Sequence, residues 1–257
     1  NYPNNQFPSK EYWQYVGDEM AQKFKDTGPG GIWIVSLYQS NGDTRLNFPV
    51  QGAPFGHVLA TASDQNDDYL AYFDNTGLKV WLQVEPGLAN VDTLIHIILN
   101  RYKHHPSVAG FGVDVEWYGV PQHSGGKKLD DQTPQHWEQK VKAVNPEYTL
   151  FLKHYSKSWM PPNYRGNIIF VDDSQDFTFS AEPFNAMISE FSAWGTKFYP
   201  NKVAFQYGYP KDRSWWSQLN DPPGDIGKAL IKNIPNCSGL FWVDFTVTEV
   251  FPPGQIP

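Results

Sequence analysis

Residues 108–116 read VAGFGVDVE, a run of apolar and small residues that ends in two acids. Continuous apolar runs of this length are typical of parallel strands that are buried on both faces. Seven similar runs follow or precede it: Gly31–Tyr38, Val58–Ala62, Lys79–Pro86, Thr149–Tyr155, Asn167–Asp172, Lys202–Tyr209 and Ser238–Phe245. Stretches with helical spacing of apolar residues separate the runs. Eight strands alternating with helices in 257 residues predict an α/β fold, the (β/α)8 TIM barrel.

The intervening segments predict helices with identifiable ends. The expected ranges are Tyr12–Lys25, Asn66–Asn75, Asp92–Tyr102, Pro134–Val144, Ser180–Trp194 and Ile226–Ile234. Gly77 is expected to end the second helix, and Thr133 to cap the fourth. A doubly wound open sheet is the alternative fold, but no glycine-rich phosphate turn follows the first strand. We expect one barrel domain over residues 1–257, with residues 1–30 as an N-terminal helical lead-in.

Charge and composition exclude several classes of protein. The formal net charge is −7, and the longest basic run is Lys127-Lys128, so binding to nucleic acid or to an anionic membrane is not expected. Aromatic residues make up 16% of the chain, which indicates either an unusually aromatic core or a ligand site. Those at or beyond predicted strand ends, such as Trp117 and Trp242, favour a neutral ligand with apolar faces. The single cysteine, Cys237, allows no intrachain disulfide. The polar N-terminus without an initiator Met is typical of a processed chain, so we expect a secreted or extracellular protein.

The candidate catalytic residues are Asp114 and Glu116. In a TIM barrel the chemistry lies at the carboxyl ends of the strands, and these two acids end the fourth predicted strand. Two positions apart on a strand, they are expected to point to one face, where like charges repel and one carboxyl group keeps a proton. Such a group can serve as a general acid. The alternative is that both lie in a loop and bind only solvent or backbone.

Other polar and aromatic residues end the remaining strands and are predicted to bind substrate. Glu85 and Asp172 are each candidates for a second carboxylate opposite Glu116, although Glu85 could instead cap the next segment. Trp242 is predicted to form an apolar floor under a sugar ring, the alternative being a core role. The other predicted substrate-binding residues are Tyr38, His154, Gln206 and Tyr207.

No metal or cofactor is predicted. The histidines show no HxH or HExxH spacing, and His104-His105, just before Pro106, is interpreted as a loop. No GxSxG elbow for a serine nucleophile is present. A metal-dependent hydrolase therefore ranks below a carboxylate-based enzyme.

The strand at residues 109–116 resembles the DGxDxDxE signature of glycoside hydrolase family 18, the chitinases and endo-β-N-acetylglucosaminidases. Gly110, Asp114 and Glu116 match the pattern, whereas Ala109 and Gly112 stand where the family has aspartates. The runs KVWLQVEPG, VAFQYGYP and SGLFWVDF are loosely similar to other strands of that family. A remote related TIM-barrel glycosidase family is the alternative.

The resemblance implies a hydrolase that cleaves a β-linked, amino-sugar-containing polysaccharide or oligosaccharide. Glu116 would protonate the glycosidic oxygen, and Asp114 would orient the substrate's 2-acetamido group. Gln206 or Tyr207 would hold that group above Trp242. The alternatives are a two-carboxylate glycosidase and a carbohydrate-binding barrel without activity, which the missing acids at Ala109 and Gly112 favour. The sequence does not determine the oligomeric state.

Overall fold

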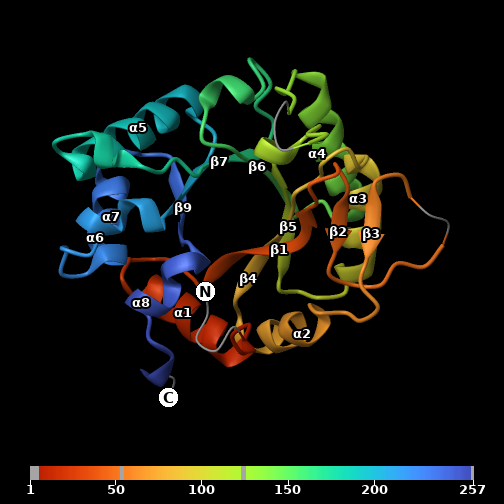
Figure 1. Cartoon of the computed structure of the whole chain (residues 1–257), viewed down its shortest axis with the longest axis horizontal. Coiled ribbons are helices and arrows are strands. Elements are labelled where there is room, and N and C mark those ends of the chain that lie inside the picture. The colour runs from red at the N-terminus through yellow and green to blue at the C-terminus, as the bar shows by residue number, and fades with distance from the viewer. Residues whose placement is uncertain (1–5, 53–54, 123–125, 256–257) are drawn as a thin grey trace. The chain divides into compact units, whose positions relative to one another are not determined.

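The computed structural model describes residues 6–52, 55–122 and 126–255 (Figure 1). The chain forms two compact units, one of residues 31–169 and one of residues 1–30 together with 170–257. Within the described residues, no helix combines the length and the apolar character that crossing a bilayer requires.

The unit of residues 31–169 is built on a sheet whose strands have the order β3-β2-β1-β4-β5-β6. The strands are β1 (Gly30–Tyr38), β2 (Thr44–Leu46), β3 (Val58–Ala60), β4 (Lys79–Val84), β5 (Val108–Asp114) and β6 (Thr149–Lys153). The helices are α2 (Asp67–Thr76), α3 (Val91–Tyr102) and α4 (Gln132–Val144), and α3 and α4 lie outside β5 in Figure 1. Strands β4, β5 and β6 pair in parallel, so their carboxyl ends share one edge.

The two faces of β4, β5 and β6 carry different side chains. One face is apolar and fully buried, as Leu82 and Val113 show. On the other face Gly112 lies beside Phe151, and a Cβ atom at position 112 would come within 2.0 Å of the Phe151 ring. Because side chains alternate along a strand, this ring lies one layer below Asp114 and Lys153. Glycine at 112 is therefore what allows an aromatic ring to fill this layer.

Strand β2 was not predicted from the sequence. It has three residues and pairs antiparallel with β1, with Leu37 opposite Arg45. The connecting turn is closed by the amide of Gln39, which donates to the carbonyl of Asp43 at 2.8 Å. Gly42 in this turn has a φ of 90°, a conformation that favours glycine. Three residues are too few to produce a recognisable alternating pattern, which explains the omission.

The second unit contains the remaining strands, which alternate with helices. Strand β7 (Ile168–Asp172) ends in this unit, and β7, β8 (Val203–Tyr207) and β9 (Cys237–Trp242) pair in parallel. Its helices are α1 (Lys10–Gln22), α5 (Pro183–Phe198), α6 (Arg213–Trp216), α7 (Pro222–Asn233) and α8 (Val247–Val250). Stacked aromatic rings form the core between α5 and the strands: Phe170 on Phe198 at 4.1 Å, and Phe191 on Phe205 at 4.7 Å.

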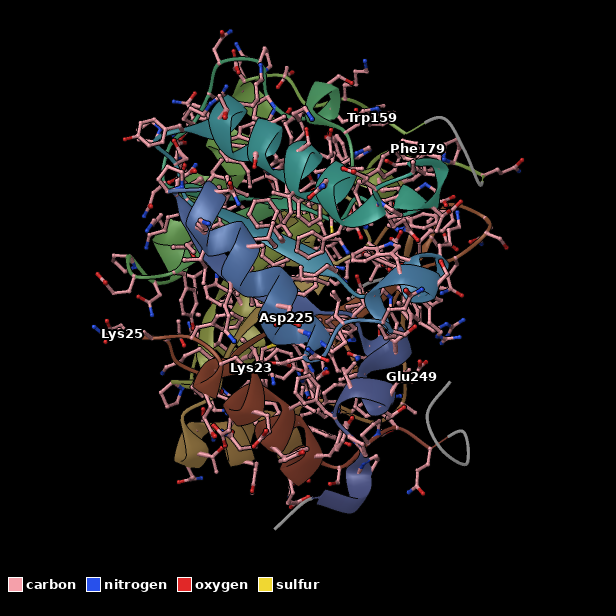
Figure 2. All side chains as sticks on the ribbon, turned by 90° about the vertical axis from the view of Figure 1, so that its left-hand side faces the viewer. Lys23, Lys25, Trp159, Phe179, Asp225 and Glu249 are labelled. Carbon is pink, nitrogen blue, oxygen red and sulfur yellow. The ribbon has the colours of Figure 1, made fainter. Side chains whose placement is uncertain are left out.

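Helix α1 is tied to α7 by an ion pair. Lys23, just after α1, contacts Asp221, which precedes α7, with 2.8 Å between Nζ and Oδ1. Figure 2 shows Lys23 close to the helix that carries Asp225. Tyr12 of α1 also donates its hydroxyl to the carbonyl of Phe251 at 2.8 Å. The N-terminal helix is therefore an integral part of this unit.

All eight predicted strands and the six predicted helices are present with shifted ends. The predicted strand Val58–Ala62 differs in its pairing, because β3 runs parallel to β2, which is antiparallel to β1, and it is therefore not the parallel neighbour of β1 that was expected. Gly77 ends α2 in the left-handed conformation, as predicted. The prediction that Thr133 caps α4 is wrong, because the helix begins at Gln132 after Asp131. The amide of Thr133 donates to Asp130 Oδ1 at 2.7 Å, so Thr133 already belongs to the first turn.

Candidate active site

The carboxyl ends of β5 and β6 hold an ion pair that is almost completely buried. Lys153 Nζ lies 2.9 Å from Asp114 Oδ2, and the two side chains are 7% and 4% exposed. The two residues are partners in the register of the parallel strands, so the sheet itself brings them together. A buried carboxylate needs a nearby cation to remain charged, and Lys153 supplies it.

Glu116 lies beside this pair, but not where the strand pattern placed it. Strand β5 ends at Asp114, and residues 115–117 form a 3₁₀ turn, so the prediction that Asp114 and Glu116 share a strand face is wrong. The turn forms because Asp114 Oδ1 accepts the amide of Glu116 at 3.3 Å. Burial and the charge of Asp114 raise the pKa of Glu116, and Lys153 partly opposes them. Glu116 is therefore biased towards its protonated form.

Glu85 is the third carboxyl group at this edge of the sheet. It follows β4 directly, and its Oε2 accepts the amide of Tyr38 at 2.9 Å. Burial raises the pKa of Glu85 to about 7, and the charge of Asp114 adds to the effect. Near neutral pH this group exchanges a proton readily. The structure thus brings Glu85 together with Asp114 and Glu116, and the contact with Tyr38 shows that it also holds β1.

Two aromatic stacks flank the carboxyl groups along the chain. The ring of Tyr38 stacks on Trp117 with 4.8 Å between centroids, directly after Glu116. His154, next to Lys153, stacks on Trp159 at 4.8 Å, and its Nδ1 accepts the amide of Ser156 at 2.8 Å. Burial lowers the pKa of His154 to about 4, so the neutral ring carries its hydrogen on Nε2. His154 is therefore neutral and can donate a hydrogen bond through Nε2.

Lys153 and Gln83 also lie at the ends of predicted strands, but no role was predicted for either of them from the sequence. Gln83 is fully buried two positions before Glu85, and within the described part of the chain neither polar atom of its side chain has a hydrogen-bond partner. An unpaired buried amide is costly, so a water molecule or a ligand group is expected to bind it. Strand alternation from Glu85 is the signal that could have identified Gln83.

The other predicted site residues belong to the second unit. Asp172 ends β7 fully buried, and the amide and hydroxyl of Ser174 both donate to its Oδ1, at 2.9 Å and 2.6 Å. Burial raises the pKa of Asp172 well above its usual range, so the carboxyl group holds a proton. Its Oδ2 has no hydrogen-bond partner in the described residues. Gln206 is partly exposed on the strand face opposite Tyr207.

Tyr207 and Trp242 are held by contacts within the second unit. The hydroxyl of Tyr207 donates to the carbonyl of Pro223 at 3.0 Å, and the side chain is 1% exposed. The polar atom of Tyr207 is thus engaged with α7, and the role of Tyr207 in holding a substrate stays a prediction. Trp242 is partly buried, donates to Thr246 Oγ1 at 2.9 Å, and meets Trp216 edge-on.

No family model and no curated protein matches the sequence. Among solved structures, the chain is similar to an endo-β-mannanase/endo-β-glucanase from Prevotella bryantii, with 12% sequence identity and a TM-score of 0.57. The match covers 96% of this chain and 42% of that one, so this chain spans less than half of the length of the protein it matches. At this identity the likeness shows the fold, and it confirms the predicted α/β TIM barrel.

Proposed function

We propose that this chain is a glycoside hydrolase that cleaves β-linked polysaccharides, with Glu116 as the general acid. The observation that carries the proposal is the group of Glu85, Asp114 and Glu116 at the carboxyl ends of β4 and β5, the end of a TIM barrel where catalytic residues lie. Glycosidic bonds are cleaved by such paired acids, one protonated and one charged. The fold is also that of an endo-β-mannanase/endo-β-glucanase, although the low identity carries only the fold.

The three carboxyl groups differ in environment, and this difference suggests their roles. Glu116 has a raised pKa and would protonate the oxygen of the leaving sugar. Asp114 is fixed by Lys153, so it would act as a stationary negative charge that orients the substrate and stabilises positive charge in the transition state. Glu85, with a pKa of about 7, is the preferred second carboxylate if the reaction uses two acids.

The aromatic stacks and the unpaired amide favour a sugar as the ligand. Apolar faces of a pyranose ring stack on indole and phenol rings such as Trp117 and Tyr38, while its hydroxyl groups need polar partners such as Gln83. The resemblance to family 18 favours an amino sugar, in which case the 2-acetamido group would contact Asp114. A polymeric substrate of this kind also favours a secreted or extracellular protein.

Hydrolysis of defined oligosaccharides tests the proposal. Chito-oligosaccharides, β-mannan oligosaccharides and β-glucan oligosaccharides are incubated with the protein, and reducing ends are measured. We expect Glu116→Gln to lower turnover by about 10²-fold or more, the scale of a general acid. The matched control is Glu147→Gln, since Glu147 is exposed and lies outside the carboxyl group cluster. Equal turnover in the Glu116→Gln variant and the parent would refute the assignment.

A carbohydrate-binding barrel without catalysis is the second candidate, and one contact favours it. Lys153 neutralises Asp114, and no acid stands at Gly112 to support it. In that case none of the three substrate classes is cleaved, yet one of them binds. Isothermal titration with the same oligosaccharides would then show that the parent binds one of them, while the reducing-end assay shows that the parent releases no product from it.

A further inference from the structure

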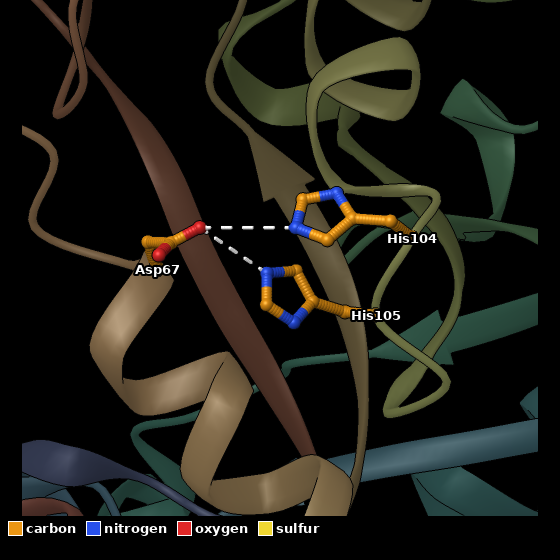
Figure 3. A group of neighbouring side chains, drawn as sticks. All are labelled: Asp67, His104 and His105. Carbon is orange, nitrogen blue, oxygen red and sulfur yellow. Dashed lines mark hydrogen bonds and ion pairs between the residues drawn. The ribbon is translucent and has the colours of Figure 1, made fainter.

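Two histidines and an aspartate meet in the unit of residues 31–169, at the amino-terminal side of β5. Asp67 is the first residue of α2, and His104 and His105 lie between α3 and β5 (Figure 3). Oδ1 of Asp67 is 3.3 Å from Nε2 of His105 and 3.9 Å from Nε2 of His104. All three ligand atoms lie within 4.8 Å of one another. Because β5 carries Asp114 at its other end, this cluster is separate from the candidate active site.

The distances from Asp67 to the two imidazole nitrogens are close to those of a tetrahedral metal site. Zinc binds imidazole nitrogen and carboxylate oxygen at about 2.0–2.2 Å, which places neighbouring tetrahedral ligands about 3.3–3.5 Å apart. The separation of 3.3 Å between Asp67 and His105 already has this value, and the 3.9 Å separation to His104 needs a shift of about half an ångström. His104 and Asp67 are exposed, so both side chains can make this adjustment.

Asp74 prepares His105 as a ligand. Its Oδ2 lies 2.6 Å from Nδ1 of His105, and its Oδ1 accepts the amide of Ser107 at 2.9 Å. A carboxylate only accepts hydrogen bonds, so Nδ1 carries a hydrogen towards Asp74. Nε2 then faces Asp67 either with a second hydrogen, as an imidazolium, or with the lone pair that a metal ion would bind. Histidine ligands of metal ions are commonly oriented by such a carboxylate. His105 is only 4% exposed, which fixes the ring in this orientation.

Two acceptor atoms that face each other at 3.3 Å require a positive centre between them, either a proton or a metal ion. A proton would make a simple ion pair, as in His136 and Asp92, where Nε2 and Oδ2 are 2.6 Å apart. In the residues that the structure describes, that pair is not part of a group of three ligands, whereas Asp67 faces two imidazoles. A simple ion pair needs neither a third ligand nor a carboxylate that orients the histidine, and this cluster has both.

We propose that Asp67, His104 and His105 bind one Zn²⁺ ion, with water in the fourth position. Imidazole and carboxylate ligands suit zinc, and three protein ligands with an open position are a known arrangement. The ion joins the start of α2 to the segment that leads into β5, at the face of the barrel where residues serve stability. The spacing of histidines alone predicts no metal, because the aspartate of the proposed site comes from a distant segment.

Titration of chelator-treated protein with ZnCl₂ tests the site. Isothermal titration should give one Zn²⁺ per chain, and thermal unfolding should show a Tm that rises with Zn²⁺ concentration. Asp67→Asn and His104→Ala change exposed side chains and should each weaken binding at least tenfold. Asp74→Asn should weaken it about 10–100-fold, since an amide facing Nδ1 favours the tautomer that protonates Nε2. The matched control, His136→Ala, should bind as the parent does.

Several results would contradict the proposed zinc site. No saturable binding at millimolar ZnCl₂, or equal affinity in His104→Ala and the parent, would show a simple ion pair and overturn the proposal. Loss of binding in His136→Ala would place the ion elsewhere. MgCl₂ should leave the Tm unchanged, because Mg²⁺ prefers oxygen ligands, and a shift of equal size would contradict zinc selectivity.

Discussion

Replacing Glu85 by glutamine should change how the stability of the protein depends on pH. The carboxyl group has a pKa of about 7 in the folded protein against an ordinary value of 4.5, because burial and Asp114 disfavour its charge. Glutamine has the same shape, stays neutral, and can still accept the amide of Tyr38. The variant therefore removes the cost of the buried charge and leaves the packing in place.

The sign of the effect follows from proton binding. Below pH 4.5 the carboxyl group is protonated in both the folded and the unfolded chain, so the parent and Glu85→Gln should be similarly stable. Between pH 4.5 and pH 7 only the folded protein keeps the proton, so the parent loses stability as the pH rises. Each pH unit costs about 1.4 kcal/mol, and the full interval costs about 3 kcal/mol. The glutamine variant should gain this amount relative to the parent above pH 7.

Urea unfolding of both proteins between pH 4 and pH 9 measures the difference. The difference in the free energy of unfolding should be near zero at pH 4 and should reach a plateau near pH 8. Glu147→Gln, a change at an exposed carboxyl group, should follow the parent throughout. A constant difference between Glu85→Gln and the parent at every pH would refute the reasoning, because it would show that Glu85 does not titrate in this range.

Three further changes test other parts of the structure. Lys153→Met should destabilise the protein by about 3–5 kcal/mol in urea unfolding, since it leaves Asp114 buried without a cation, and adding Asp114→Asn should recover part of this loss. Gly112→Ala should cost about 1–3 kcal/mol, because its methyl group meets the Phe151 ring, and Phe151→Leu in the same chain should recover stability. Tyr207→Phe should cost about 1 kcal/mol through the lost bond to α7 and leave turnover on the cleaved oligosaccharide unchanged; a fall in turnover alone would indicate that the residue holds the substrate.

The fold could be predicted because each predicted strand corresponds to a short apolar run in the sequence. Runs such as those at β5 and β8 are mostly apolar and buried, and the helices between the strands carry apolar residues at helical spacing. Strand β2 was not predicted because its three residues are too few to give a pattern, and its pairing with β1 and β3 is set by contacts between segments. Strand ends were less predictable. The side chain of Asp114 accepts the amide of Glu116 and ends β5 two residues early, a contact that no apolar pattern reveals.

The candidate site was predicted only in part. Residues that end an apolar run could be identified, whereas contacts that depend on pairing between distant segments could not. Asp114 and Glu85 could be identified because each ends an apolar run. The partnership of Asp114 with Lys153 depends on how β5 pairs with β6, and the cluster of Asp67, His104 and His105 depends on where α2 packs. Neither relation has a signature within a single segment. The contact of the Tyr207 hydroxyl with α7 is a similar long-range relation.

The pairing of Gly112 with Phe151 has a consequence for how this sequence can change over time. Position 112 is where the family 18 pattern has an aspartate, and here the neighbouring ring fills the volume of that side chain. An acid could enter at 112 only together with a small residue at 151. The two positions should therefore covary among homologues, and a glycine and an aromatic residue, each two positions before the Asp–Lys pair, give a signature by which relatives of this chain can be found.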